Sequence, residues 1–132
     1  MKAHEYLCHI RFSDVDVYGH VNNVKYFEYY QEARVAFLTD LHEQEDSSLA
    51  VVVARMNVDY RRPILFRPEP YVVRSNVTRV GRSSLTLAAD VLDGEQVLSR
   101  SEAVLVAFDP AARHSRPWTD RERTVLGAAV LL

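Results

Sequence analysis

Hydrophobic and polar positions follow two different periods along the chain, and the change between them divides it into parts. Residues 6–12 alternate, which places their apolar side chains on one face and predicts a strand. A polar loop follows at 13–21, and Asn22 or Asn23 is a suitable N-cap for a helix. From 24 to about 42 there is no proline or glycine, and two apolar stripes cover much of the circumference. This pattern predicts a long, buried helix.

The period changes to two after a polar linker at 43–48 and stays at two for most of the remaining chain. Four further strands are predicted at 49–62, 71–80, 84–92 and 96–108. Asp93-Gly94, between the last two, is the strongest hairpin signal in the chain. Because the connections are mainly tight turns, we expect an antiparallel sheet that curves around the single helix. The tail at 109–132 is expected to end in a short helix from Thr119, and the sequence does not indicate where it packs.

The composition is that of one ordinary globular domain. The chain has 132 residues, of which 48% are hydrophobic and 26% are charged. We therefore expect a single domain over 1–132, with a core at about 5–108 followed by the tail. Cys8 is the one cysteine, which excludes an intrachain disulfide. No apolar leader and no membrane-spanning apolar run are present in the sequence, so we expect a cytoplasmic protein without a membrane partner.

The formal net charge of -2 hides an imbalance between the two parts of the chain. Residues 1–50 carry nine acids and four bases, whereas residues 51–132 carry nine acids and twelve bases. Seven arginines between Arg55 and Arg82 are accompanied by only two acids. A basic strip of this kind favours an anionic partner. The arginines are not interleaved with aromatic residues in a nucleic-acid-binding pattern, so we do not expect nucleic acid as that partner.

Chemically active side chains gather in the loop before the long helix. They are Asp14, Asp16, Gly19, His20, Asn22 and Asn23. Free backbone N–H groups at a helix start can stabilise an oxyanion, and a carboxylate nearby can act as a base or a nucleophile. The arrangement therefore favours acyl chemistry. The alternative interpretation is that Asp14 or Asp16 only caps a turn.

The same loop resembles the opening motif of a known enzyme family. The run DVDVYGHVNNVKYF at 14–27, followed by Glu32-Ala33-Arg34, is similar to hotdog-fold acyl-CoA thioesterases of the 4-hydroxybenzoyl-CoA thioesterase-like branch. Weaker similarities at Arg62-Pro63 and at the turn 81–84 extend the resemblance over 5–108. The resemblance implies an α+β hotdog fold, in which a five-stranded antiparallel sheet wraps around one long central helix. It also implies a homodimer, and in many members a homotetramer.

The resemblance assigns roles to individual residues of this chain. Asp16, the second acid of the motif, corresponds to the catalytic carboxylate, which activates water or attacks the thioester directly. A backbone N–H at about Asn23 corresponds to the group that polarises the thioester carbonyl. Some members have a histidine seven residues after the aspartate, where this chain has Asn23, and His20 lies only four residues after it. Further substrate-binding candidates at the same helix start are Gly19, His20, Val21 and Tyr26.

Coenzyme A carries three phosphate groups, which the basic strip could contact. The candidates near strand ends are Arg61, Arg62, Arg79 and Arg82, with Ser83 beside the last. The alternative is that these arginines only decorate solvent-facing strand positions. We expect no cofactor, because coenzyme A is part of the substrate. We expect no metal either, because the histidines and the single cysteine lack metal-ligand spacing.

These observations together predict an enzyme that hydrolyses an acyl-CoA thioester to the free acid and CoA. Three alternatives remain open: an acyl-carrier-protein thioesterase, a non-catalytic acyl-CoA-binding hotdog module, and a hotdog hydratase, against which the position of Asp16 argues. Two other residues attract attention. Cys8 is interpreted as a small buried hydrophobe rather than a nucleophile, and Glu32 is kept as a reserve candidate for a helical carboxylate.

Overall fold

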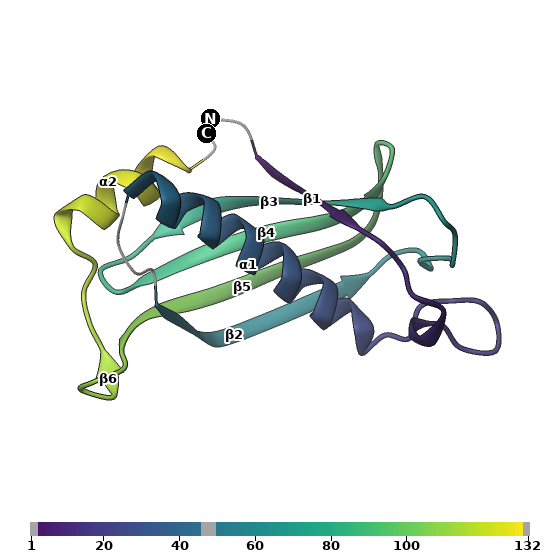
Figure 1. Ribbon diagram of the computed structural model, residues 1–132, viewed down its shortest axis with the longest axis horizontal. Coiled ribbons are helices and arrows are strands. Elements are labelled where there is room, and N and C mark those ends of the chain that lie inside the picture. The colour runs from purple at the N-terminus through teal and green to yellow at the C-terminus, as the bar shows by residue number, and fades with distance from the viewer. Residues whose placement is uncertain (1–2, 46–49, 131–132) are drawn as a thin grey trace.

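The computed structural model describes residues 3–45 and 50–130, which form an antiparallel sheet with one long and one short helix (Figure 1). In chain order the elements are β1 (His4–Cys8), a 3₁₀ turn (Phe12–Asp14), α1 (Lys25–Glu45), β2 (Val51–Tyr60), β3 (Tyr71–Val80), β4 (Ser84–Asp93), β5 (Gln96–Asp109), β6 (His114–Ser115) and α2 (Asp120–Ala128). The helix and the five long strands predicted from periodicity are all present. A two-residue sixth strand, β6, was not predicted and pairs with the end of β5.

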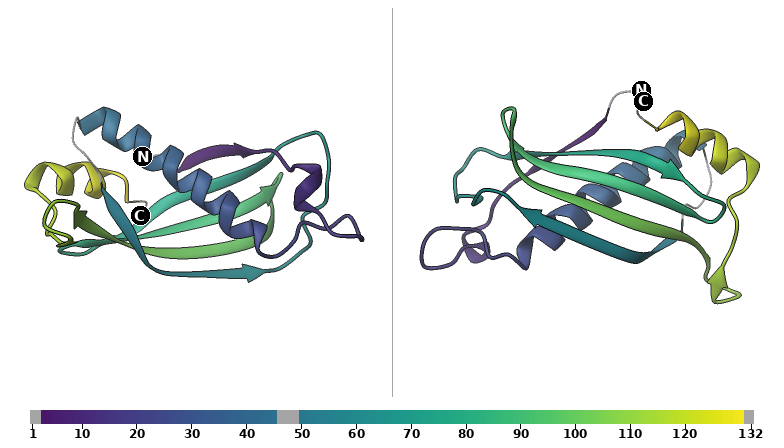
Figure 2. Two further views of the ribbon diagram at one scale, coloured as in Figure 1. Left: turned by 60° about the horizontal axis from the view of Figure 1, so that its bottom comes forward. Right: turned by 180° about the vertical axis from the view of Figure 1, so that it is seen from behind.

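The five long strands lie in the order β1-β3-β4-β5-β2, and α1 crosses one face of the sheet (Figures 1 and 2). The predicted tight connections hold for β3–β4 and β4–β5. The connection from β2 to β3 is the exception, and β2 pairs with β5 at the far edge of the sheet. The segment 61–70 between β2 and β3 contains three prolines, which cannot supply ladder N–H groups or close a two-residue hairpin. That segment therefore travels around one end of the sheet, and this end holds the candidate site.

Two boundaries differ from the sequence-based expectations by more than two residues. The first strand ends at Cys8, and Phe12 begins the 3₁₀ turn with 79% of its surface exposed instead of facing the core. The long helix continues to Glu45, into the predicted linker, whose positions 46–48 and the following Leu49 lie outside the described residues.

One apolar stripe on α1 is buried along its length, whereas the other is buried only toward the C-terminal end of the helix, at Leu41. Tyr26, Tyr30, Ala33 and Phe37 face the sheet and are at most 3% exposed. Phe27, near the start of the other stripe, and Val35, about two turns later, remain 42% and 54% exposed. The sequence predicts that α1 is buried around most of its circumference, and this prediction is wrong for one copy of the chain. The outer face of α1 is left for another surface to cover.

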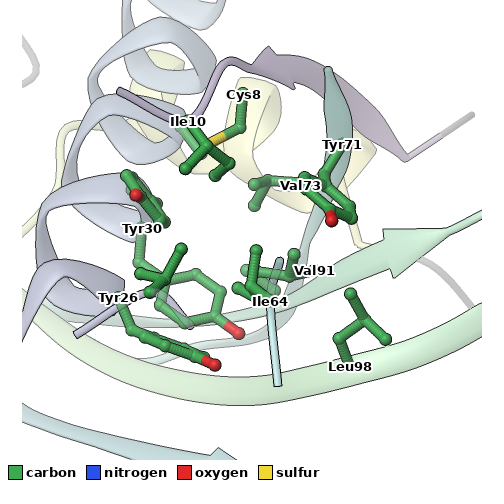
Figure 3. Close-up of a cluster of buried hydrophobic side chains, with 13 residues drawn as sticks. Cys8, Ile10, Tyr26, Tyr30, Ile64, Tyr71, Val73, Val91 and Leu98 are labelled. Atoms are coloured by element: carbon green, nitrogen blue, oxygen red, sulfur yellow. The ribbon is translucent and has the colours of Figure 1, made fainter. Parts of the chain in front are cut away.

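The core consists of two clusters along α1. Figure 3 shows the first, in which Tyr26 and Tyr30 of α1 lie over Ile64, Val73 and Val91. Cys8 belongs to this cluster, and burial raises the pKa of its thiol to about 12. A thiol with this pKa stays protonated at neutral pH, so Cys8 packs as a small hydrophobe, as predicted.

The second cluster shows where the C-terminal tail packs, which the sequence does not indicate. Phe37 and Leu41 at the other end of α1 pack with Trp118 and with Leu126 of α2. The predicted helix from Thr119 is present: its hydroxyl caps the N-terminus by accepting the N–H of Glu122, and Glu122 in turn accepts the Thr119 N–H. Within the described residues, no helix is long and apolar enough to cross a membrane.

Candidate active site

A pocket of about 430 Å³ opens where the loop before α1 meets the end of β2. Its lining residues are Asp16, His20, Val21, Asn22, Asn23, Tyr26, Tyr60, Arg61, Arg62 and Pro63. Eight of these residues are candidates named from the sequence: Asp16, His20, Val21, Asn22, Asn23, Tyr26, Arg61 and Arg62. The gathering results from two segments far apart in sequence, because the segment 61–70 packs against the loop. His20 pairs with Leu65 by a β-bridge, and the Phe66 N–H donates to the Gly19 carbonyl at 3.3 Å.

Asp14 anchors the loop from below and does not line the pocket. Its side chain is fully buried, and its Oδ2 accepts the Tyr29 hydroxyl at 2.7 Å and the Arg11 backbone N–H at 3.1 Å. Its Oδ1 lies 3.0 Å from the Arg11 guanidinium. Burial acts to raise the pKa of Asp14, but these hydrogen bonds and the arginine outweigh it and hold the pKa below its usual value. Asp14 is therefore a buried carboxylate that fixes the loop to α1.

Asp16 is exposed and combines a capping contact with a place in the pocket. Its Oδ1 accepts the backbone N–H groups of Tyr18 at 2.9 Å and His20 at 3.1 Å. The turn that directs these groups needs Gly19, which has a φ of +76°. Within the described part of the chain, no partner is recorded for the other oxygen, Oδ2. Asp16 therefore caps its turn with one oxygen and leaves the other accessible from the pocket. Its interpretation as a turn cap and its interpretation as a catalytic carboxylate are compatible.

The N-terminus of α1 lies in the same pocket. Asn22 fixes the turn that leads into the helix: its Oδ1 accepts the Val24 N–H at 3.0 Å, and its carbonyl accepts the Lys25 N–H at 2.9 Å. For the N–H of Asn23, the structure records no acceptor among residues 3–45 and 50–130. This donor lies beside the positive end of the helix dipole and suits an oxygen that gains negative charge.

Tyr60 is a pocket residue that sequence reasoning missed. Its hydroxyl donates to the Asn23 carbonyl at 3.0 Å, and its ring packs edge-on against Tyr26 with centroids 4.7 Å apart. The sequence shows Tyr60 only as one position in the alternating pattern of β2. Contacts across 37 residues carry no local signal that could have identified it.

The arginines of the basic strip divide into two groups. Arg61 and Arg62 lie at the pocket, and both of their backbone N–H groups donate to the Leu98 carbonyl at 3.0 Å. Neither guanidinium forms a salt bridge with a described residue. Arg67 and Arg74, in contrast, pair with Asp93 and Glu5. The interpretation as surface decoration fits the paired arginines, whereas the two at the pocket keep their charge available to an anion.

Arg82 and Ser83 do not reach the pocket of their own chain. They form the turn after β3, which starts beside the pocket and runs ten residues away from it, a distance of about 30 Å. Their backbone carbonyls accept the N–H groups of Trp118 and Ala107 at 3.0 Å and 2.7 Å. Arg79, near the end of β3, lies toward the same end. This separation is the main difference between the sequence-based site and the site within one chain.

The reserve candidate Glu32 also lies elsewhere. It lines a second hollow of about 500 Å³ between β1 and α1, together with Tyr6, Cys8 and Glu28. The residues that the structure describes contain no group of three or more histidine, cysteine or acidic side chains placed to hold a metal ion.

Comparison with known proteins agrees with this geometry. Residues 10–125 match the model of the thioesterase-like superfamily. The long-chain acyl-CoA thioesterase FadM of Escherichia coli is 31% identical over 109 residues, covering 76% of this chain and 79% of FadM. YsmA of Bacillus subtilis is 32% identical over 123 residues, covering 89% of this chain and 80% of YsmA.

Solved structures give the same result. A thioesterase from Thermus thermophilus, complexed with coenzyme A and Zn, is 32% identical with a TM-score of 0.74, covering 93% of this chain and 94% of that one. A predicted thioesterase from Bacillus stearothermophilus has a TM-score of 0.87 over 98% of this chain and 97% of that one; at 24% identity it supports the fold alone. The chain has the hotdog fold, belongs to the thioesterase-like superfamily, and is a thioester hydrolase.

Proposed function

We propose that the chain hydrolyses an acyl-CoA thioester to the free acid and CoA, with Asp16 as the catalytic carboxylate. The observation that carries this proposal is the convergence of two groups in one pocket: an aspartate with an unoccupied oxygen and a helix-start N–H for which the described residues supply no acceptor. FadM acts on long-chain acyl-CoA, and the related Thermus structure contains coenzyme A, which supports this class of substrate.

The geometry suits Asp16 as a general base. Asp16 Oδ2 takes a proton from water, and the water oxygen bonds to the thioester carbon. The carbonyl electron pair moves onto its oxygen, which the Asn23 N–H stabilises. When the carbonyl re-forms, the C–S bond breaks and the CoA thiolate leaves, taking the proton from Asp16. The same two groups serve a nucleophilic route, in which Oδ2 bonds to the thioester carbon, expels the thiolate, and the resulting anhydride is hydrolysed by water.

A thioester needs less assistance than an ester or an amide. Its carbonyl carbon is more electrophilic than that of an ester, and a thiolate is a good leaving group. One carboxylate and oriented N–H donors can therefore suffice without a Ser-His-Asp triad. Asn23, in the position where some related enzymes have histidine, contributes its backbone N–H and an amide side chain in the pocket wall.

Arg61 and Arg62 are proposed to bind the phosphates of CoA at the mouth of the pocket. A substrate that keeps the thioester but lacks the phosphates, an acyl-N-acetylcysteamine, separates this contribution from the chemistry. We expect Arg61→Ala and Arg62→Ala to raise KM for acyl-CoA about tenfold while leaving kcat/KM for the truncated thioester unchanged. An equal loss on both substrates would contradict the phosphate assignment.

The active form is proposed to be a homodimer. β2 is an edge strand with Val52 and Val53 exposed, and Phe27 and Val35 are exposed on the outer face of α1. Arg82 and Ser83, about 30 Å along β3 from their own pocket, can contribute to catalysis only in a second copy.

Release of free thiol from a panel of short, long and aromatic acyl-CoA thioesters, with the corresponding acyl-carrier-protein thioesters alongside, tests the reaction. We expect turnover on acyl-CoA to exceed turnover on the same acyl group carried by the protein. Faster turnover of the acyl-carrier-protein thioesters would contradict acyl-CoA as the substrate class. Tight binding of acyl-CoA without any thiol release would contradict the proposed reaction.

A further inference from the structure

We propose that Tyr60 is a positioning residue for thioester hydrolysis, because its hydroxyl holds the peptide turn that presents the Asn23 N–H to the substrate carbonyl. This inference rests on the proposed function, in which that N–H stabilises the oxyanion. Tyr60 is the last residue of β2 and lines the pocket with 47% of its surface exposed. It lies outside the loop motif that supplies Asp16 and Asn23.

The carbonyl of Asn23 lacks the partner that a regular helix would give it. In an α-helix this oxygen accepts the N–H four residues later, which is that of Phe27. Here the Phe27 N–H donates instead to the Val24 carbonyl at 3.2 Å, so the first turn is tightened. The Tyr60 hydroxyl donates to the Asn23 carbonyl at 3.0 Å and takes the vacant place.

Two consecutive peptide planes at the pocket are fixed as a result. The Asn22 carbonyl and the Asn23 N–H belong to one plane, which is held where that carbonyl accepts the Lys25 N–H at 2.9 Å. The next plane contains the Asn23 carbonyl and the Val24 N–H. It is held from one side by Tyr60 and from the other by Asn22 Oδ1, at 3.0 Å in both cases. Losing the Tyr60 contact leaves the plane next to the proposed oxyanion donor held by Asn22 Oδ1 alone.

Tyr60 is itself held in place by contacts with the core. Its ring packs against Tyr26 of α1 at an interplanar angle of 69°. Below it, the Tyr30 hydroxyl donates to Ser99 Oγ at 2.7 Å, and Ser99 Oγ donates to the Asp59 carbonyl at 2.9 Å. These two hydrogen bonds join α1, β5 and the end of β2. The hydrogen bond from the Tyr60 hydroxyl to the Asn23 carbonyl therefore ties the exposed turn at the pocket to the core.

The substitution Tyr60→Phe tests the role of the hydroxyl, because it keeps the ring against Tyr26. Small errors in the placement of a catalytic group reduce the rate of the chemical step, so we expect kcat to fall about tenfold. We expect KM to stay within about twofold, and Tm within about 3 °C, since only one half-exposed hydrogen bond is lost. Tyr6→Phe, which removes the same atom from a tyrosine on β1 outside the pocket, should keep the wild-type kcat.

The outcomes separate this inference from the proposed function. An unchanged kcat in Tyr60→Phe would overturn the positioning role, as would a raised KM or a loss of activity shared with Tyr6→Phe. Asp16→Asn is measured in the same assay. If Asp16→Asn is inactive while Tyr60→Phe is fully active, the positioning inference alone fails. If Asp16→Asn is as active as the wild type, the proposed mechanism fails and the role of Tyr60 fails with it.

Discussion

Asp14 and Asp16 lie two residues apart and take different roles because their surroundings differ. The Asp14 carboxylate is fully buried, and its Oδ2 accepts hydrogen bonds from the Tyr29 hydroxyl and the Arg11 backbone N–H. The Asp16 carboxylate is exposed in the pocket and uses one oxygen to cap its own turn. An acid that must react with a substrate needs an accessible oxygen, whereas an acid that fixes a loop needs strong contacts with the residues around it. Differences in burial and hydrogen bonding therefore make Asp14 the residue that positions the loop and leave Asp16 accessible for chemistry.

The lowered pKa of Asp14 predicts how stability depends on pH. Its pKa is below the usual value of about 3.9 in the folded state, so the stabilisation is fully present above pH 4 and is lost as pH falls through the folded-state pKa. We expect Asp14→Asn to lower the free energy of unfolding by about 2 kcal/mol at pH 7. The difference from the wild type should shrink as pH falls toward 2. Urea unfolding of both proteins across this range measures it, and a difference that stays constant with pH would contradict the account.

Much of the candidate site could be predicted at the scale of residues, because Asp16, His20 and Asn23 follow one another in a loop with recognisable chemistry. Tyr60 could not, since its role comes from a hydrogen bond across 37 residues. Arg61 and Arg62 were identified from charge and position at a strand end. The same reasoning also selected Arg82, which the fold carries to the opposite end of the sheet.

At the scale of elements, α2 shows how the tail is joined to the core. Both Glu122 oxygens contact the Arg116 guanidinium, at 2.7 Å and 2.8 Å, and the Glu122 side chain is buried. Hydrogen bonding to Arg116 holds the pKa of Glu122 below its usual value, despite burial, which acts to raise it. The carboxylate also completes the capping box with Thr119. One side chain thus closes the N-terminus of α2 and fixes the segment before it.

The capping contact gives a prediction for the tail. Thr119→Ala removes the hydroxyl that accepts the Glu122 N–H, and we expect it to lower the free energy of unfolding by about 1 kcal/mol. Leu126→Ala empties a fully buried position and should lower it by about 3 kcal/mol. Emission of Trp118, the single tryptophan, follows both in chemical unfolding. Effects below about 0.3 kcal/mol in both variants would show that the tail does not belong to the cooperative core.

The elements themselves could be predicted where their signals are local. Alternation located β3, β4 and β5 closely, and Asp93-Gly94 identified the hairpin between the last two. The partner of β2 could not be predicted, because β2 pairs with β5 across an intervening hairpin and no short turn records that pairing. The boundary of β1 was wrong because Phe12 continues the alternation in sequence although the chain has already turned at that point.

At the scale of the whole molecule, the exposed face of α1 and the free edge of β2 predict self-association. We expect light scattering to give twice the 15.1 kDa chain mass at micromolar concentration. Val35→Lys places a charge on the outer face of α1, at a position 54% exposed in one chain. It should shift the protein toward monomer and lower kcat with it, while leaving the helical content unchanged. A monomeric wild type with full activity would contradict the dimer proposal.

The Asp16 carboxylate is proposed to drive thioester hydrolysis, and the decisive measurement is kcat of Asp16→Asn for thiol release from acyl-CoA. Asparagine keeps an oxygen that can accept the Tyr18 and His20 N–H groups, so the loop should persist while the base or nucleophile is lost. We expect kcat to fall by about 100-fold or more with little change in Tm. Asp120→Asn, which changes an exposed acid on α2, should keep the wild-type kcat. A folded Asp16→Asn variant with kcat within about threefold of the wild type would contradict the account.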